Sequence, residues 1–271
     1  MNTAVTPEQV SSYRRDGFVV HPNLLTAGEL ADLRGAVDEA VASLGKRRVA
    51  ASDNAWEVES GETYYEKVFT QKLNLWKINA TIKRVMLAPE IGRMIGELSG
   101  VPAFRLWHDQ ALIKEPFANP TGWHLDDPFW SFFSRDAISI WIALDDATLE
   151  NGCLFYVPGS QRLADFRNCL IGENLDDLFK IYPDFRKIGT ISTPVKAGGA
   201  VFHNGLTAHG AGANMTNGRR RAMTAGYMPV GSTFNGQQNI LPDKLFKSYQ
   251  LGDVLQDDVQ NPQVWPPVAA A

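Results

Sequence analysis

Hydrophobic residues in the N-terminal third of the chain recur at the three- and four-residue spacing of amphipathic helices. A capping signal at Thr6 predicts a short helix that ends near Gly17. A second capping signal at Thr26 begins a longer helix that ends at Gly45, and its apolar face consists of Leu30, Leu33, Val37, Val41 and Leu44. A third helix is expected over residues 89–100, so this part of the chain is predicted to be helical.

From about residue 101 the pattern changes to short apolar or alternating runs separated by Gly, Pro, Asn and Asp, which is typical of β-strands. Strands are predicted at residues 18–20, 104–114, 137–144, 153–157, 190–194, 200–207 and 221–228. Helices followed by strands indicate an α+β fold, mainly β, in which N-terminal helices flank a β-barrel or sandwich. We expect a single domain over residues 1–271, with a helical part at about 1–100, a barrel core at about 101–230 and a surface tail at about 231–271.

Two of the predicted strands have one face that mixes small residues with large polar or aromatic ones, as the lining of a cavity does. These faces consist of Trp107, Asp109, Ala111 and Ile113 in one strand, and of Ala137, Ser139, Trp141 and Ala143 in the other. The opposite face of the second strand is Ile138, Ile140 and Ile142, which is expected to pack under helices. This alternation predicts that Asp109 faces inward and that His108 has a structural role on the other side.

Composition limits the classes of partner. The chain has 271 residues, 44% of them hydrophobic, and a net charge of −4 from 26 basic and 30 acidic side chains. With a pI near 5.8 it lacks the basic surface that nucleic acids require. No apolar run reaches the ~20 residues of a membrane span, and the N-terminus has no signal-peptide pattern. Two cysteines cannot form a disulfide framework, so we expect a cytoplasmic protein.

The pair His124 and Asp126 is the first candidate metal site, because residues i and i+2 of a strand point to the same side. A second histidine, His209, lies far downstream at the end of a predicted strand. Two histidines and one carboxylate leave three octahedral positions open, which favours Fe(II) that also binds a cosubstrate and O2. Eleven residues after His209, Arg220 offers a guanidinium that can bind a carboxylate through two hydrogen bonds.

Other interpretations of these residues remain open from the pattern alone. A His-x-Asp pair also occurs as a structural hydrogen bond on a strand. His203 competes with His209 for the metal, since six residues along a strand keep the same face. Its other possible roles are a place beside the site, a substrate contact or a hydrogen-bonded core histidine. In the basic run 219–221, the spacing from His209 selects Arg220 to point inward.

Several motifs in this order resemble the phytanoyl-CoA dioxygenase family of Fe(II)- and 2-oxoglutarate-dependent oxygenases. The resemblance covers most of the chain, from about Thr6 to Pro229. The motifs are Thr6-Pro7-Glu8-Gln9, Tyr13, Asp16-Gly17-Phe18, His124-x-Asp126, Asn151-Gly152-Cys153-Leu154, Pro158-Gly159-Ser160, and His209-Gly210-Ala211-Gly212 followed by Arg220. The resemblance implies a double-stranded β-helix, which is a jelly-roll, cupin-like barrel.

The resemblance also implies the roles of individual residues. His124, Asp126 and His209 are the expected iron ligands and catalytic residues, Arg220 pairs with the distal carboxylate of 2-oxoglutarate, and Trp141 lies beside that cosubstrate. The implied reaction consumes O2, oxidises a substrate and decarboxylates 2-oxoglutarate to succinate and CO2. We expect the oxidation of the substrate to be a hydroxylation.

Position 126 separates oxygenation from halogenation within such enzymes. In halogenating relatives the position is Gly or Ala, so the carboxylate of Asp126 predicts oxygen insertion or another oxidation. Three other positions depart from the family pattern: Leu125 stands where members often have Gln, Ala211 where some have Ser, and Gln161 where many have His. Each departure could remove one hydrogen bond to the cosubstrate or to a ligand, whereas the four principal positions, His124, Asp126, His209 and Arg220, are intact.

The substrate is expected to be a small or medium-sized metabolite. Apart from Lys46, Arg47 and Arg48, no cluster of basic residues suits the phosphates of a CoA thioester, so we do not expect an acyl-CoA substrate. Residues 162–187, between two predicted strands, are expected to cover the substrate together with Trp56, Tyr64 and Tyr65. The apolar residues of this stretch are Phe166, Leu170, Leu175, Leu178, Phe179, Tyr182 and Phe185.

Two alternative functions fit a barrel with this site. One is a cupin-like isomerase or hydrolase that uses another metal and binds its substrate through Arg220. The other is a non-catalytic barrel that binds a carboxylate or a metal. Consumption of 2-oxoglutarate and formation of succinate distinguish the oxygenase from both.

Overall fold

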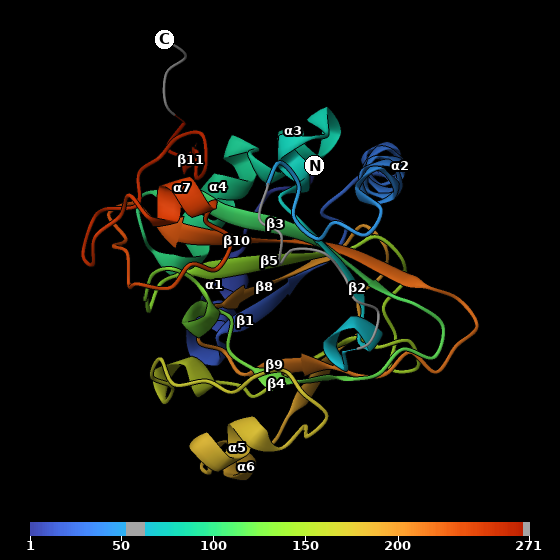
Figure 1. Cartoon of the computed structure of the whole chain (residues 1–271). Helices are drawn as coiled ribbons and strands as arrows, with labels where there is room; N and C mark the ends of the chain where they lie inside the picture. The colour runs from blue at the N-terminus through green and yellow to red at the C-terminus, as the bar shows by residue number, and fades with distance from the viewer. Residues whose placement is uncertain (53–62, 268–271) are drawn as a thin grey trace.

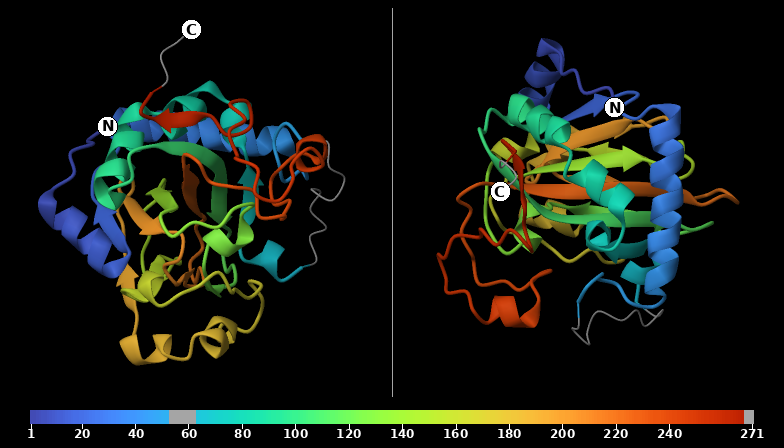
Figure 2. Two further views of the ribbon diagram at one scale, coloured as in Figure 1. Left: turned by 90° about the vertical axis from the view of Figure 1, so that its left-hand side faces the viewer. Right: turned by 90° about the horizontal axis from the view of Figure 1, so that it is seen from above.

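The computed structural model describes residues 1–52 and 63–267. In this part of the chain, two antiparallel sheets face each other, and helices cover the outer face of the larger sheet (Figure 1). The predicted α+β architecture, mainly β with N-terminal helices beside a jelly-roll barrel, is confirmed. Figure 2 shows the same arrangement from two further sides, and in the view from above α2 runs across the strands of the larger sheet.

The larger sheet has seven strands within the described residues, in the order β1-β8-β5-β10-β3-β11, and β2 pairs with β3. Their bounds are β1 Phe18–His21, β2 Thr70–Leu73, β3 Phe104–Lys114, β5 Ile138–Ala143, β8 Ala200–Asn204, β10 Arg220–Pro229 and β11 Gln263–Trp265. The smaller sheet has the order β4-β9-β6-β7. It consists of β4 Thr121–His124, β6 Leu154–Tyr156, β7 Ile191–Thr193 and β9 His209–Ala211.

The two predicted capping boxes form as expected, at Thr6 before α1 and at Thr26 before α2. The longer helices are α1 Pro7–Asp16, α2 Ala27–Leu44, α3 Ala80–Met86 and α4 Pro89–Ser99. The shorter ones are α5 Asp177–Ile181, α6 Phe185–Ile188 and α7 Asp243–Phe246, with 3-10 turns η2 Tyr65–Lys67, η3 Leu75–Lys77, η4 Asp127–Phe129 and η5 Ser160–Arg162. The sequence prediction missed α3, because seven residues are too few for a helical period to stand out.

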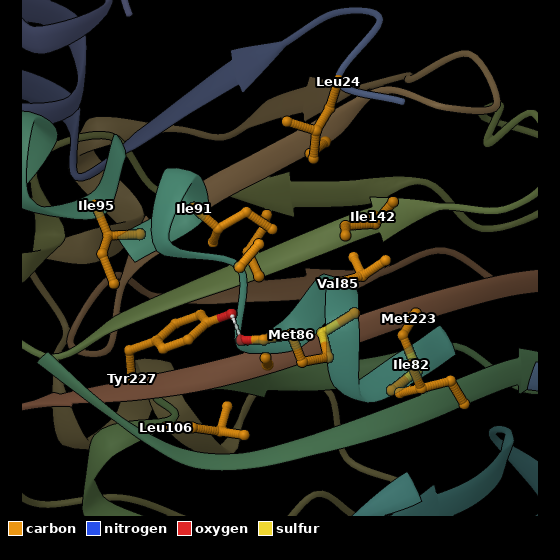
Figure 3. Close-up of a cluster of buried hydrophobic side chains, with 14 of the residues drawn as sticks. Leu24, Ile82, Val85, Met86, Ile91, Ile95, Leu106, Ile142, Met223 and Tyr227 are labelled. Carbon is orange, nitrogen blue, oxygen red and sulfur yellow. Dashed lines mark hydrogen bonds between the residues drawn. The ribbon is translucent and has the colours of Figure 1, made fainter. Parts of the chain in front are cut away.

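The main core lies between these helices and the larger sheet. Ile138, Ile140 and Ile142 of β5 are fully buried there, as their alternation predicts. Figure 3 shows how side chains from α3 and α4 meet those of β3, β5 and β10. The hydroxyl of Tyr227 donates to the carbonyl of Met86 at 2.9 Å, which joins β10 to the end of α3 inside this core (Figure 3).

The assignment of the two faces of β3 was wrong. The register of β10 against β3 jumps between Gly226, opposite His108, and Tyr227, opposite Leu106, so Trp107 is left over as a β-bulge. Because a bulge inserts one residue, it reverses which side chains face inward beyond it. His108 therefore lines the interior, and Asp109 lies on the helix side.

Asp109 has a structural role there. Its carboxylate accepts the backbone N–H groups of Leu75 and Trp76 at 2.7 and 2.8 Å and so caps η3. Burial raises the pKa of Asp109 to about 7.

The C-terminal segment extends the core instead of lying on the surface as expected. Phe234, Ile240, Leu241 and Leu255 are buried together with residues of β3 and β10. β11 adds a strand beside the start of β3. In residues 1–52 and 63–267 no helix combines the length and the apolar character that crossing a membrane requires.

Candidate metal centre

His124 and His209 lie opposite each other where β4 pairs with β9. Their ring centroids are 4.2 Å apart. Asp126 follows two residues after β4 ends, where the backbone turns, and the N–H groups of Asp126 and Asp127 both donate to the carbonyl of Gly205. Oδ1 of Asp126 lies 3.6 Å from Nε2 of each histidine. The three ligand atoms are within 4.8 Å of one another, a spacing that one ion can bridge.

Both imidazoles are oriented by backbone carbonyls. Nδ1 of His124 lies 2.9 Å from the carbonyl of Gly122, and Nδ1 of His209 lies 2.9 Å from that of Thr207. A carbonyl only accepts, so Nδ1 carries the proton and Nε2 keeps a free lone pair that points at the shared position. Burial, together with the neighbouring His124, holds the pKa of His209 well below its usual range, which keeps it available as a neutral ligand.

The second oxygen of Asp126 is held by the larger sheet. Ser139 Oγ donates to Oδ2 at 2.7 Å, and Nε2 of His203 lies 3.0 Å from the same oxygen. Nδ1 of His203 lies 3.0 Å from the hydroxyl of Tyr156. Burial disfavours a charged Asp126, but the surrounding imidazoles outweigh it and hold the pKa of this carboxyl well below its usual range. Of the roles left open for His203, the structure supports the one beside the site.

Arg220 begins β10 and is buried at the other end of the same cavity. Its Nε and Nη1 have no hydrogen-bond partner in the described structure, and its guanidinium carbon lies 5.2 Å from the ring centre of Trp141. Burial lowers the pKa of Arg220 to about 10, so it is still a cation near neutral pH. Unsatisfied donors on a buried cation are what a carboxylate ligand requires.

The neighbours of Arg220 in the basic run face outward, as the spacing predicts. Arg219 and Arg221 form ion pairs with Asp38 on α2, and Arg221 also pairs with Asp145. Lys114 stands opposite Arg220 in the register of β3 and β10, and its buried ammonium donates to the carbonyls of Val68 and Asn119. Burial lowers the pKa of Lys114 to about 7.

A cavity of about 730 Å³ joins the three ligands to Arg220. Two rows of the larger sheet form its floor because side chains two residues apart share a face. One row runs across four strands as His203, Ser139, Gly226 and His108. The next row runs as Trp141, Thr224 and Gln110, so Trp141 lies on the path between the ligands and Arg220.

The expected cover over the cavity is present in part. From residues 162–187, Leu170 and Ile171 line the cavity, and Tyr65 lines it from η2. Tyr64 instead donates its hydroxyl to the carbonyl of Pro120, and Trp56 lies outside the described residues. Most of the apolar residues of the stretch pack against each other and under β4, namely Leu178, Phe179, Tyr182 and Phe185.

Part of the cavity wall comes from the segment expected to be a surface tail. Gln238, Asn239 and Ile240 line the cavity. Asn239 also accepts a hydrogen bond from the indole N–H of Trp107 at 3.0 Å. Ile240 and Leu241 form a short apolar pair that could have indicated burial in the sequence.

Two histidines and a carboxylate with free donor atoms on one side suit an Fe(II) ion that keeps open positions for exchangeable ligands. The negative charge of the Asp126 carboxylate attracts a divalent cation, and neutral imidazoles can donate a lone pair to it. The orphaned donors of Arg220 at the far end of the cavity match an anionic cosubstrate. The residues therefore fit both groups.

Comparisons with known proteins point to the same chemistry. The family model described as phytanoyl-CoA dioxygenase matches residues 13–222. Methylphosphonate hydroxylase of Gimesia maris is 27% identical over 231 residues, which are 84% of this chain and 82% of that protein. Ectoine dioxygenase of Bordetella parapertussis is 27% identical over 254 residues, 86% of this chain and 78% of that protein.

Two solved structures resemble the fold over nearly its whole length. The alpha-ketoglutarate-dependent carbocyclase SnoK from nogalamycin biosynthesis superposes with a TM-score of 0.78 at 28% identity, covering 96% of both chains. The epimerase SnoN in complex with Fe3+, alpha ketoglutarate and nogalamycin RO gives 0.75 at 28% identity, covering 95% of this chain and 97% of that one. Alpha-ketoglutarate is another name for 2-oxoglutarate, so the names of both neighbours point to this cosubstrate.

Proposed function

Since this chain belongs to the phytanoyl-CoA dioxygenase family and is an Fe(II)- and 2-oxoglutarate-dependent dioxygenase, we propose that His124, Asp126 and His209 bind its iron. The convergence of their three ligand atoms within 4.8 Å carries this assignment. The ligands come from β4, the turn after it and β9, so the pairing of two short strands assembles the site.

The bound iron, with 2-oxoglutarate and O2, supplies the oxidation of the substrate, coupled to formation of succinate and CO2. The protein supplies the geometry. Ser139 and His203 hold one oxygen of Asp126, so the carboxylate offers the other oxygen to the metal.

Arg220 positions the cosubstrate in this proposal. Its free donors bind the distal carboxylate of 2-oxoglutarate, and the ring of Trp141 supports the guanidinium and borders the cosubstrate. The cavity between Arg220 and the ligands is enclosed by the sheet on one side and by Leu154 and Ala211 of the smaller sheet on the other. The two sheets thereby confine the space between Arg220 and the ligands.

The substrate is proposed to be a small or medium-sized metabolite, and the expected outcome is hydroxylation. Relatives named for methylphosphonate and ectoine support a small-molecule substrate. The carbocyclase and epimerase neighbours mean that product analysis should include ring closure and inversion as well as hydroxylation. The alternatives of a cupin-like isomerase or hydrolase that uses another metal, and of a non-catalytic barrel, are not supported, because the relatives are named as a hydroxylase and a dioxygenase and the structural neighbours are alpha-ketoglutarate-dependent enzymes.

An anaerobic titration with Fe(II) and 2-oxoglutarate tests the site. The native protein should develop the visible charge-transfer band of the chelate, and Asp126→Ala should need more Fe(II) to reach the same intensity. Asp136→Ala is the matched control, since Asp136 is exposed and lies outside the cavity lining. An unchanged Fe(II) requirement in Asp126→Ala, or no band in a native protein that still binds iron, would contradict the assignment.

A further inference from the structure

The cavity has room for much more than a metal ion and 2-oxoglutarate. Its volume of about 730 Å³ lies within the ~300–1,000 Å³ of pockets that hold drug-sized ligands. It also extends past His108 and Gln110 of β3 toward η2, β2 and the segment around Asn239. This outer part, called here the substrate chamber, is bounded by His108, Gln110, Phe129, Trp130, Tyr65, Gln71, Arg48 and Ile240 with their neighbours.

The walls of the substrate chamber are mainly hydrophobic, with aromatic faces. Phe129 and Trp130 follow directly after the ligand turn, and Tyr65 lines the chamber from η2. Trp130 packs so closely on Gly226 that a Cβ there would lie 2.8 Å from its ring. The aliphatic wall residues are Val49, Leu73, Leu170, Ile171 and Ile240. Such walls favour a hydrophobic ligand with flat rings.

Charged side chains in the described lining are already engaged. Asp126 belongs to the metal centre, and Arg220 to the cosubstrate. Nη2 of Arg48 lies 3.3 Å from Oε1 of Glu66, a half-buried residue whose Oε2 accepts the N–H and hydroxyl of Thr63. Residues 53–62 contain no Lys or Arg, so that stretch of sequence offers no cation either. An anionic substrate would therefore lack a free cationic partner.

Neutral hydrogen-bonding groups are present instead. Gln71 donates to Gln110 across the pair β2 and β3, and both line the chamber. His108 also lines it, and its Nδ1 has no hydrogen-bond partner within the described residues. Burial lowers the pKa of His108 to about 4, so the imidazole is neutral near pH 7. Amides and a neutral imidazole suit hydroxyl and carbonyl groups.

Resting on the proposed function, we propose that the substrate is an uncharged, mainly hydrophobic ring compound whose hydroxyl or carbonyl group binds near Gln110 and His108. It lies against Trp130, with the ligand turn at one end of the chamber. The ion pair of Arg48 and Glu66 excludes carboxylates, phosphates and acyl-CoA.

Three matched probes with one ring system test the proposal: 2-(hydroxymethyl)anthraquinone, anthraquinone-2-carboxylate and anthraquinone-2-sulfonate. Their binding to the anaerobic protein with Fe(II) and 2-oxoglutarate is measured by calorimetry. The neutral alcohol should bind at least tenfold more tightly than either anion. Equal or tighter binding of an anion, or no binding of the alcohol at millimolar concentration, would overturn the proposal. Methylphosphonate and palmitoyl-CoA serve as further probes, and binding of either in preference to the alcohol would also overturn it.

A charge variant tests the exclusion of anions. Glu66→Gln removes the negative partner of Arg48 while keeping an oxygen for Thr63. It should improve binding of anthraquinone-2-carboxylate at least fivefold and leave the neutral alcohol within twofold. Glu97→Gln is the control, because Glu97 is exposed and pairs with Arg93 on α4. Unchanged affinity for the carboxylate in Glu66→Gln would show that this ion pair does not exclude anions.

The visible band of the iron–2-oxoglutarate complex is recorded in every sample. Loss of that band in the native protein would contradict the proposed function, whatever the probes do. A normal band with the wrong order of probe affinities would contradict only the substrate class.

Discussion

Nε2 of His203 lies 3.0 Å from Oδ2 of Asp126, and this contact joins the two sheets at the metal centre. His203 stands next to Ser139 in the register of β8 and β5, so both side chains reach the same carboxylate oxygen. The charged carboxylate only accepts, hence His203 donates through Nε2 and accepts at Nδ1 from Tyr156. The larger sheet thereby holds Oδ2 and leaves Oδ1 of Asp126 near Nε2 of His124 and of His209.

Removing this contact should weaken iron binding without disturbing the cosubstrate. His203→Phe keeps a ring but loses the donor, and we expect the Kd for Fe(II) to rise by about 10–100-fold. Competition with a chelator measures that Kd. At saturating iron, the Kd for 2-oxoglutarate should stay within twofold. Tyr156→Phe is the matched control and should have a smaller effect, since it touches Asp126 only through His203. An unchanged iron affinity in His203→Phe would show that the contact does not position Asp126.

Arg220 should control the affinity for 2-oxoglutarate. Arg220→Gln removes a charge-assisted hydrogen bond of about 1.5–3 kcal/mol, so the Kd for 2-oxoglutarate should rise by about 10–100-fold. Arg219→Gln should leave it unchanged, because Arg219 faces Asp38 outside the cavity. Both values come from the intensity of the visible band. Equal effects of the two substitutions would argue that Arg220 acts only through general charge.

His108 should make the apoprotein sensitive to acid. Burial lowers its pKa in the folded protein from 6.5 to about 4. Between these values the unfolded chain binds a proton that the folded chain does not, so stability falls as pH drops from 6.5 toward 4. The loss is on the order of 3 kcal/mol. Urea unfolding at several pH values should show a flatter dependence in His108→Gln, and the same slope in both proteins would contradict the prediction.

The close contact of Trp130 with Gly226 predicts a cost for any side chain at that position. A Cβ at Gly226 would lie 2.8 Å from the indole ring, so Gly226→Ala should destabilise the protein by about 1–3 kcal/mol. Gly35→Ala is the matched control, because nothing lies within 4 Å of its Cβ position in α2. That change should stabilise the helix by about 0.5–1 kcal/mol. Denaturant unfolding of both variants checks the opposite signs, and equal effects would contradict the contact.

The structure brings His124 and Asp126 together, but by another route than strand alternation predicts. The sequence indicated that His124 and Asp126 chelate one ion because they share a strand face. In the structure β4 ends at His124, and Asp126 reaches the same point from a turn that Gly205 anchors. The His124-x-Asp126 motif could be recognised in the sequence because few residue types bind metals. The turn could not be predicted, because it depends on hydrogen bonds to Gly205, about eighty residues away in the chain.

The amino-acid sequence by itself determined the local elements and the identity of the chemistry. The capping boxes at Thr6 and Thr26 and the alternating isoleucines of β5 are patterns among residues close together in the sequence. The spacing between His209 and Arg220 can likewise be read directly from the sequence. Only the tertiary structure decided which side chains line the substrate chamber. The bulge at Trp107 turns His108 inward and Asp109 outward, and it arises from pairing with β10 more than one hundred residues later. Strand alternation cannot reveal such an inserted residue, because the inversion exists only when the two strands are in register.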